Sequence, residues 1–402
     1  MQQPSLSRRA TPLAAMLPAG APAHAIAFDS GHASPTVLPD LVSAAANALS
    51  TYRDETLQYA PRPGLAEMRK WIADYMTADG CNTAPEEILV TNGAKHAIDL
   101  ICRLLLDEGD SIVVTSPTYF TAIPIFRSYG VGFIEISQDA EGMNVEELAL
   151  VLARMASEGR AMPKLIYNVP DFHNPTGVSM SVARRRALVR LARQYDVFII
   201  EDSPYRKVRF EGDSMPPVKS FDTDGRVLLV GTFSKLMAPG LRVGWVAASP
   251  ALIARLIQLK SDGGSCPLTQ RIILEYCQGD ALDLHSRRVQ TTYRANRDRM
   301  IAALARELPA ASFVIPEGGY YLWLEFQPDV DGDEVARLAR EAGVIVLPGS
   351  KFFARDDIAQ PRQFVRLAFS HASAAEIDDG VRRVAGAYAA CAAAAPELVR
   401  AP

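Results

Sequence analysis

The sequence of 402 residues is poor in the side chains that build metal centres and disulfide frameworks, since it has only five cysteines and six histidines. The cysteines are odd in number and scattered along the chain: Cys81, Cys102, Cys266, Cys277 and Cys391. No pair of them has the spacing of a zinc site, so we expect no metal. Scattered free thiols are typical of a reducing compartment, which predicts a cytoplasmic protein.

Long apolar runs and blocks of basic residues are also missing. No apolar run reaches the ~18 residues that a membrane-spanning helix needs, so we expect no membrane association. Basic and acidic residues are mixed along the chain and leave a formal charge of -4, which argues against a nucleic-acid partner. Arg8 and Arg9 could begin a twin-arginine export signal, but prolines interrupt the apolar residues that follow, and an N-terminal arm is favoured.

Short β-branched runs alternate with helical patterns over the first 250 residues. This alternation predicts an α/β fold with a mostly parallel seven-stranded sheet and helices on both faces. Most of the expected strands are continuously apolar, as strands buried on both faces are. They are residues 87–91, 111–115, 131–136, 164–168, 197–201, 226–231 and 243–247.

One of the expected helices, Val182–Tyr195, carries five arginines that we expect on a solvated face: Arg184, Arg185, Arg186, Arg190 and Arg193. After residue 250 the pattern changes to helices followed by short strands, which is typical of a smaller α+β domain. Helices are expected at 281–308, 333–342 and 374–388, and strands at 312–315, 320–326, 344–347 and 363–369. We therefore predict an N-terminal arm (1–45), a large domain (46–280) and a small C-terminal domain (281–402).

The most informative segment surrounds Lys235, which follows a strand pattern and a turn rich in hydroxyl groups. A lysine amine can form a Schiff base with a carbonyl cofactor. Thr232, Ser234 and Arg242 in the same segment could bind a phosphate through charge-assisted hydrogen bonds. The segment resembles the lysine motif of the class I/II aminotransferases, which bind pyridoxal 5′-phosphate (PLP) and have the fold called type I.

Four further segments match this family in the same order, and each follows an expected strand. They are a glycine turn at 91–95, an aromatic segment at 117–119, an Asn-Pro turn at 174–177 and an acidic strand end at 201–205. Each alone is an ordinary turn or strand end. Together with the Lys235 segment, in the order of the family, they favour one cofactor site over coincidence.

The resemblance implies a role for each matching residue. Lys235 holds the aldehyde of PLP, Asp202 pairs with its ring nitrogen and Tyr119 stacks on its ring; these three are the implied catalytic residues. Asn174 and Tyr205 contact the phenolic oxygen. The implied phosphate ligands are Gly93, Ala94, Lys95, Thr232, Ser234 and Arg242. The sequence departs from the family pattern at Lys95, where a small polar residue or glutamine is common, and at His173, where glutamine is common.

The resemblance also extends to the substrate and to assembly. Arg366, in an expected strand, matches the arginine that grips the α-carboxylate of the substrate. Asn174, Gly31 and His32 are the other implied substrate residues. Tyr59 matches a tyrosine that reaches the phosphate of the neighbouring subunit, which implies a homodimer with shared active sites.

The implied activity is a PLP-dependent aminotransferase of the aminoadipate/aromatic/branched-chain-like branch. It moves the amino group of an α-amino acid to a 2-oxo acid, with Lys235 as the general base and ping-pong kinetics.

Two alternatives stay open at this point. The Gly31-His32-Ala33 segment is similar to one in PLP-dependent amino acid oxidases and hydroxylases, where a histidine could serve as an acid or base. The same fold also occurs as the effector-sensing domain of GntR-like transcription regulators. We expect no such regulator here, because only about 25 residues precede the resemblance, too few for a DNA-binding module.

Overall fold

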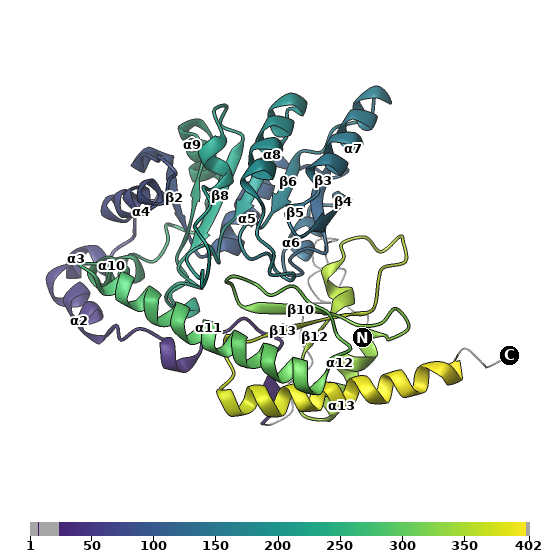
Figure 1. The fold of residues 1–402 in the computed structure, drawn as a ribbon. Coiled ribbons are helices and arrows are strands. Elements are labelled where there is room, and N and C mark those ends of the chain that lie inside the picture. Colours follow the sequence, from purple (N-terminus) through teal and green to yellow (C-terminus); the bar gives the residue numbers. More distant parts are fainter. Residues whose placement is uncertain (1–6, 8–23, 399–402) are drawn as a thin grey trace, which may run out of the picture.

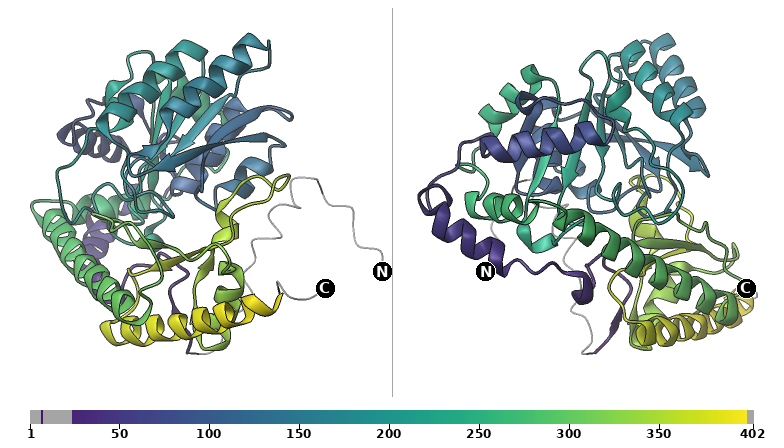
Figure 2. Two further views of the ribbon diagram at one scale, coloured as in Figure 1. Left: turned by 45° about the vertical axis from the view of Figure 1, so that its right-hand side comes forward. Right: turned by 60° about the vertical axis from the view of Figure 1, so that its left-hand side comes forward.

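The computed structural model describes Ser7 and residues 24–398 of the chain, so the Arg8-Arg9 segment lies outside the described residues. A large α/β part carries an eight-stranded sheet, and a smaller α+β part lies below it in the view of Figure 1. Figure 2 shows the same arrangement from two further sides. None of the helices within the described residues is long and apolar enough to cross a membrane.

The large sheet has the strand order β2-β9-β8-β7-β6-β3-β4-β5. The seven expected strands are confirmed, and β3, β4, β6, β7 and β8 run parallel to their neighbours in that set. β9 pairs antiparallel with both β8 and β2. An eighth strand, the two-residue β5, extends the edge by pairing antiparallel with β4. The strands are β2 (Ile88–Thr91), β3 (Ser111–Ser116), β4 (Gly132–Asp139), β5 (Gly142–Met143), β6 (Leu165–Asn168), β7 (Phe198–Asp202), β8 (Val227–Thr232) and β9 (Gly244–Ala247).

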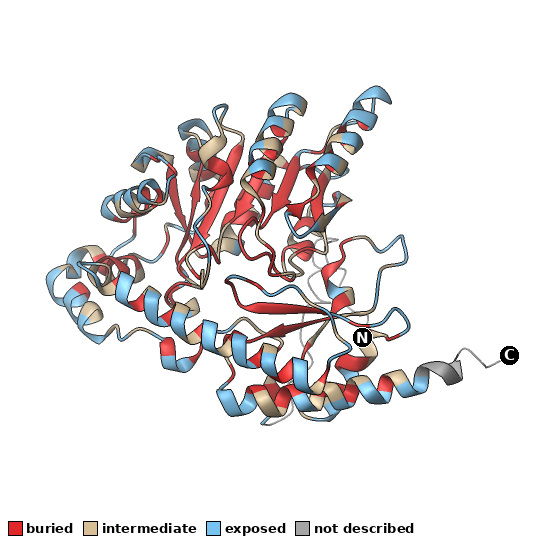
Figure 3. Cartoon of the chain, in the orientation of Figure 1, coloured by how far each residue is buried: buried red, intermediate tan, exposed pale blue. Residues whose placement is uncertain are grey.

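Helices cover both faces of this sheet, as expected from its buried strands. Successive residues of a strand point to opposite faces, and in β3 Val114 packs in a cluster with α5, α6 and α9, whereas Val113 packs with α7 and α8. The burial colours of Figure 3 show the strands as the buried centre of the large part. The helices are α4 (Ala66–Ala78), α5 (Ala94–Leu105), α6 (Ile123–Arg127), α7 (Val145–Ser157), α8 (Val182–Tyr195), α9 (Pro250–Leu259) and α10 (Pro267–Tyr276).

The arginines of α8 correct one expectation. Arg185 is not on a solvated face but has a fully buried side chain, which pairs with Asp171 at 2.7 Å. It lies on the same stripe of the helix as the buried Leu188 and Ala192. A guanidinium tolerates this place because the carbonyl groups of Pro170, Met180 and Pro216 accept its remaining hydrogen bonds.

The small part contains three long helices and a three-stranded antiparallel sheet of the order β10-β13-β12. α11 and α13 lie side by side along its lower edge in Figure 1. The strand expected at 312–315 was wrong: only Ser312 forms an isolated bridge, to Glu325, because Pro316 and the Gly318-Gly319 pair turn the chain before β10. The elements are β10 (Tyr321–Glu325), β11 (Val344–Ile345), β12 (Leu347–Pro348), β13 (Phe364–Ala368), α11 (Ala281–Glu307), α12 (Gly332–Glu341) and α13 (Ala374–Leu398).

The N-terminal residues that the structure describes pack on the small part. β1 (Ile26–Ala27) pairs in parallel with β11, and Phe28 is completely buried. α2 (Val42–Thr51) and α3 (Arg53–Thr56) then pack against α10. This path carries Gly31 and His32 past the ends of the sheet strands. Within the described residues, five short 3-10 helices complete the fold: 35–37, 85–87, 218–221, 239–241 and 349–352.

Candidate active site

The segments after four parallel strands and the start of α5 meet at one edge of the large sheet. Carboxyl ends of parallel strands lie at the same edge, which is where ligands bind in open α/β sheets. A cavity of about 360 Å³ lies there, and ten of the sequence-predicted site residues line it. These are Ala94, Lys95, Tyr119, Asn174, Asp202, Tyr205, Thr232, Ser234, Lys235 and Arg242.

Lys235 projects from the turn that follows β8. Its amino group donates a hydrogen bond to the carbonyl oxygen of Gly31 at 2.7 Å. The hydroxyl of Tyr320 donates to the main-chain oxygen of Lys235 at 2.7 Å and so fixes the turn. Burial lowers the pKa of Lys235; Tyr321 raises it and the charge of Arg366 lowers it, and the net direction is downward. A buried amine with a lowered pKa is suited to act as a nucleophile or base.

Asp202 is the last residue of β7 and is 3% exposed. Its Oδ2 accepts a hydrogen bond from the Tyr167 hydroxyl at 2.7 Å, whereas Oδ1 is buried without a hydrogen-bond partner in the described part of the chain. Burial raises the pKa of Asp202 to about 6, and the bond from Tyr167 acts in the opposite direction. A buried carboxylate oxygen without a partner is costly. Oδ1 therefore fits the N–H of a protonated ring such as that of PLP.

The other end of the cavity is positive. Among the described residues, Arg242 donates only to the carbonyl groups of Pro239 and Asn92, both at 3.3 Å. Neither Arg242 nor Lys95 forms an ion pair with any residue that the structure describes. Burial lowers the pKa of Lys95, and the charges of Arg242 and Lys235 lower it further. Cations without partners at a helix N-terminus fit a phosphate group.

The position of Gly93, at the start of α5, has no room for a side chain. It precedes α5 with φ +84°, and a Cβ atom there would lie 2.7 Å from Nη2 of Arg242. The glycine thus lets the helix start approach the arginine. The hydroxyls of Thr232 and Ser234, 3.0 Å apart, lie at the same end of the cavity.

Arg366, in β13, lies next to Asn174 and is 1% exposed. It donates to the Asn174 side-chain oxygen at 2.9 Å and to the main-chain oxygen of Asp29. Its Nε has no partner among the described residues, and no carboxylate there pairs with it. The amide of Asn174 lies 3.4 Å from the Tyr205 hydroxyl. Arg366 is a buried cation that fits an anionic group of a substrate.

Gly31 and His32 differ in how they meet the site. Gly31 contacts Lys235 directly, whereas the ring of His32 stacks edge-on against His371, with the ring centres 6.0 Å apart. Burial lowers the pKa of His32, and His371 and Lys235 lower it further against the opposite effect of Asp29. Its main-chain oxygen accepts a hydrogen bond from Ser370 at 2.8 Å.

His173 supports the turn that carries Asn174. Burial lowers its pKa to about 3, so its ring is neutral near pH 7. Its nitrogens lie 3.0 Å from the Thr115 hydroxyl and 3.1 Å from the Thr176 hydroxyl. The departure from glutamine at this position thus still provides two hydrogen-bonding groups.

Tyr59 lies apart from the cavity and is 87% exposed. The structure also brings in three tyrosines that the motifs did not single out: Tyr167 at Asp202, Tyr320 at the main chain of Lys235, and Tyr321 between Tyr205 and Arg366. Tyr320 and Tyr321 directly follow the Gly318-Gly319 pair. This pattern could have indicated site residues, although we predicted only a strand there.

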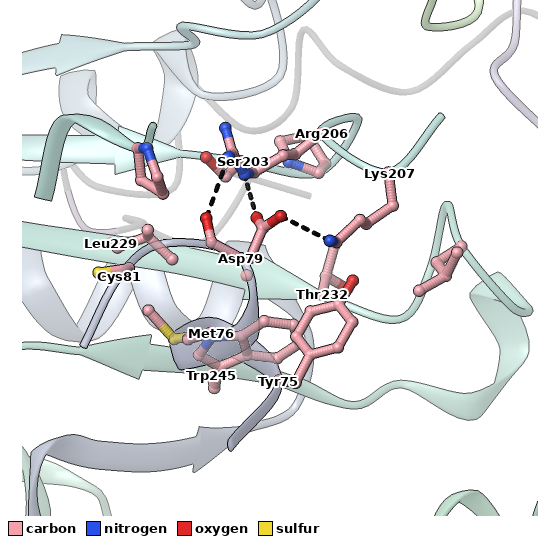
Figure 4. A pocket seen from close by; sticks show the side chains of 14 residues that line it. Tyr75, Met76, Asp79, Cys81, Ser203, Arg206, Lys207, Leu229, Thr232 and Trp245 are labelled. Atoms are coloured by element: carbon pink, nitrogen blue, oxygen red, sulfur yellow. Dashed lines mark hydrogen bonds and ion pairs between the residues drawn. The ribbon is translucent and has the colours of Figure 1, made fainter. Parts of the chain in front are cut away.

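A second, smaller cavity of about 40 Å³ lies on the other side of Thr232 and Pro204, which line both cavities. Figure 4 shows that its charged residues pair with one another: Asp79, at the end of α4, contacts both Arg206 and Lys207. Arg206 also lies 3.4 Å from the buried Asp171. These pairs tie α4 to the segment that carries Tyr205, so we interpret this region as support for the site.

Comparisons with known proteins agree with this geometry. The family model of aminotransferase class I and II matches residues 24–384. The aromatic-amino-acid aminotransferase 1 of Thermococcus litoralis is 36% identical over 341 residues, which cover 84% of this chain and 81% of that protein. The crystal structure of a multiple substrate aminotransferase from Thermococcus profundus is 32% identical with a TM-score of 0.89, covering 96% of this chain and 98% of that chain. A Pyrococcus horikoshii kynurenine aminotransferase in complex with PMP is 31% identical with a TM-score of 0.87, covering 94% and 92% of the two chains.

Proposed function

We propose that the cavity around Lys235 is the active site of this chain, which belongs to the aminotransferase class I and II family. The chain is a PLP-dependent aminotransferase of fold type I that moves the amino group of an α-amino acid to a 2-oxo acid. One observation carries the assignment of the site: a single cavity joins the half-buried Lys235 to a carboxylate oxygen at one end and two cations at the other, none of which has an ionic or hydrogen-bonding side-chain partner among the described residues.

The residues around this cavity fit the parts of PLP. Asp202 would hold its ring nitrogen, Tyr119 would cover its ring, and Asn174 and Tyr205 would contact its phenolic oxygen. Its phosphate would be held by Gly93, Ala94, Lys95, Thr232, Ser234 and Arg242. When bound, the pyridoxal group withdraws electrons from the substrate α-carbon and so weakens its C–H bond.

The protein residues bind the substrate and move its proton. Arg366 and Asn174 hold the α-carboxylate, which provides the charge partner that Arg366 lacks. Lys235 Nζ would act as the general base that takes the proton from the substrate α-carbon and as the acid that returns it. The lowered pKa of Lys235 favours the neutral amine that this step needs. A 2-oxo acid then reverses the path, which gives ping-pong kinetics.

A homodimer with shared active sites is part of the proposal. Exposed apolar side chains gather along α2 and the segment after α3, with Val42 75%, Leu57 61% and Tyr59 87% exposed. Such a surface fits a second copy of the chain, whose Tyr59 would reach the phosphate end of the cavity. A cytoplasmic location is proposed from the scattered free cysteines.

The two alternatives receive less support. The similarity to named aminotransferases favours transamination over an oxygen-dependent reaction that uses His32. The similarity to named aminotransferases favours transamination over effector sensing as well.

The test is to reduce the PLP-loaded protein with borohydride and map the labelled peptide. We expect the label on Lys235, and we expect a panel of amino acids to yield oxo acids and pyridoxamine phosphate without oxygen uptake. A label on another lysine would overturn the site. Oxygen uptake without pyridoxamine phosphate would favour the reaction that uses His32.

A further inference from the structure

Tyr321, the first residue of β10, lies at the centre of the site although no motif pointed to it. It is 4% exposed, and its hydroxyl lies 3.5 Å from the Tyr205 hydroxyl. The guanidinium carbon of Arg366 lies 3.9 Å from the centre of its ring. Tyr321 therefore contacts the proposed ligand of the substrate carboxylate and a proposed ligand of the cofactor.

The Tyr321 hydroxyl and the amine of Lys235 both lie close to Gly31. A Cβ atom on Gly31 would lie 2.0 Å from the Tyr321 hydroxyl oxygen and 3.1 Å from Lys235 Nζ, so both atoms face the same small space. The Gly31 carbonyl oxygen already accepts a hydrogen bond from Nζ at 2.7 Å. A glycine here keeps room for the hydroxyl, which any larger residue would displace.

The charges around Tyr321 favour contact with the lysine. Burial raises the pKa of Tyr321, but Lys235, Arg366 and the hydrogen bond to Tyr205 lower it, and the net direction is downward. Tyr321 in turn raises the pKa of Lys235, whereas burial and the charge of Arg366 lower it. Other titratable groups face these two residues from four further elements: Tyr205 after β7, Tyr119 after β3, Lys95 in α5 and His32 in the N-terminal segment.

A hydrogen bond between the Tyr321 hydroxyl and a neutral Lys235 amine would orient that amine. Such an amine has two N–H groups and one lone pair. If the Gly31 carbonyl accepts from one N–H and the Tyr321 hydroxyl oxygen from the other, the lone pair is left free for a proton. When the amine becomes an ammonium, both acceptors stabilise its new charge.

We propose that Tyr321 is a positioning residue for the proton transfer by Lys235: its hydroxyl oxygen accepts a hydrogen bond from the freed amine and turns the lone pair toward the substrate α-carbon. The inference rests on the proposed function of the site. The net reaction is unchanged, because Lys235 Nζ both takes and returns the proton and the tyrosine gives up none.

The test compares Tyr321→Phe with Tyr320→Phe in the holoenzyme. Tyr321→Phe keeps the ring against Arg366 and removes only the hydroxyl. The control keeps the Tyr320 ring, whose centre lies 5.0 Å from Nζ, and removes a hydroxyl that bonds the Lys235 main chain. Three quantities are measured: kcat and KM, the isotope effect with substrate deuterated at the α-carbon, and the pH at which the absorbance of the Lys235-bound cofactor changes.

We expect Tyr321→Phe to lower kcat about tenfold or more, because a misplaced reacting group is costly. The isotope effect should rise, KM should change little, and the absorbance transition should move to lower pH. Tyr320→Phe should keep the absorbance transition of the wild type, because the bond that it removes goes to the main chain of Lys235 and not to its amine.

A higher KM with an unchanged isotope effect and an unchanged absorbance transition would overturn the proposal and make Tyr321 a substrate ligand. Unchanged kinetics would overturn it as well. If the wild type itself shows neither a Lys235-bound chromophore nor transamination, it is the proposed function of the site that fails.

Discussion

At the scale of single residues, Asp202 links the site to the stability of the protein. Burial raises its pKa from 3.8 to about 6, so the folded cofactor-free chain binds a proton on Asp202 more tightly than the unfolded chain does. Stability from this group is therefore fully present below pH 3.8 and is lost as the pH rises through about 6. The loss amounts to roughly 3 kcal/mol in the free energy of unfolding.

We expect Asp202→Asn to remove this pH dependence, because an amide does not titrate. The measurement is urea unfolding of the cofactor-free wild type and variant between pH 4 and 8, from which the difference between the two free energies is plotted against pH. The free energy of unfolding of the variant should rise relative to that of the wild type as the pH rises. A constant difference over this range would show that Asp202 keeps an ordinary pKa.

Much of the site could be predicted at this scale, because glycine turns, Asn-Pro and the Lys235 segment are local patterns that stand at strand ends. The contacts of Tyr167 and Tyr321 could not, because they join residues 35 and 116 positions from their partners. From the sequence, an aromatic residue in an apolar strand is interpreted as part of the core unless its partner on another segment is known. The contact between His32 and His371 could not be predicted either, because these residues are far apart in the sequence.

At the scale of elements, Asp79 holds the end of α4 against the segment that follows β7. Its carboxylate contacts Arg206, whose side chain is 8% exposed, and Lys207 at 2.6 Å. We expect Asp79→Asn to lower the free energy of unfolding by about 3 kcal/mol. This is the lower end of the range for breaking a buried ion pair, because Arg206 retains its ion pair with Asp171. Denaturant unfolding of the holoenzyme measures this.

A matched control lies on the same helix. Asp74 pairs with Lys70 at 2.6 Å, but both side chains are about two-thirds exposed, at 66% and 68%. Such surface pairs contribute about 0–1 kcal/mol, so Asp74→Asn should have little effect. Equal losses from the two variants would contradict the role given to Asp79. A selective loss in Asp79→Asn should also weaken cofactor retention, because the segment it anchors carries Tyr205.

The elements themselves were predictable to the extent that each has a pattern of its own. Most of the seven expected strands are apolar runs and α8 has clear bounds, but the two-residue β5 is too short to leave a pattern. Arg185 shows a second limit. Charge indicates exposure only on average, and the buried partner that reverses it, Asp171, lies on another segment.

At the scale of the whole molecule, pairings between segments that are far apart in the chain could not be predicted from the sequence. β1 and β11 are two residues each and more than 300 positions apart, yet their parallel pairing brings Gly31 to Lys235. The two-part architecture followed from the change of pattern near residue 250. The boundaries of the domains stay a prediction; α2 spans residue 45 and α11 starts at Ala281.

The proposed shared site can be tested by mixing two inactive variants. Lys235→Ala removes the amine, and Tyr59→Ala removes the side chain that we propose reaches the phosphate of the partner. In a mixed dimer, one site has both defects, while the other combines Lys235 of one chain with Tyr59 of the other and is intact. After unfolding and refolding an equal mixture, about one site in four should be active, since half of the dimers are mixed and each mixed dimer has one intact site. Transaminase activity per chain measures this.

The two variants, each refolded alone, are the controls. The mixture could stay as inactive as these controls while size-exclusion chromatography shows dimers. Tyr59 would then not contribute to the active site of the partner subunit, and the exposed apolar surface of α2 would need another explanation.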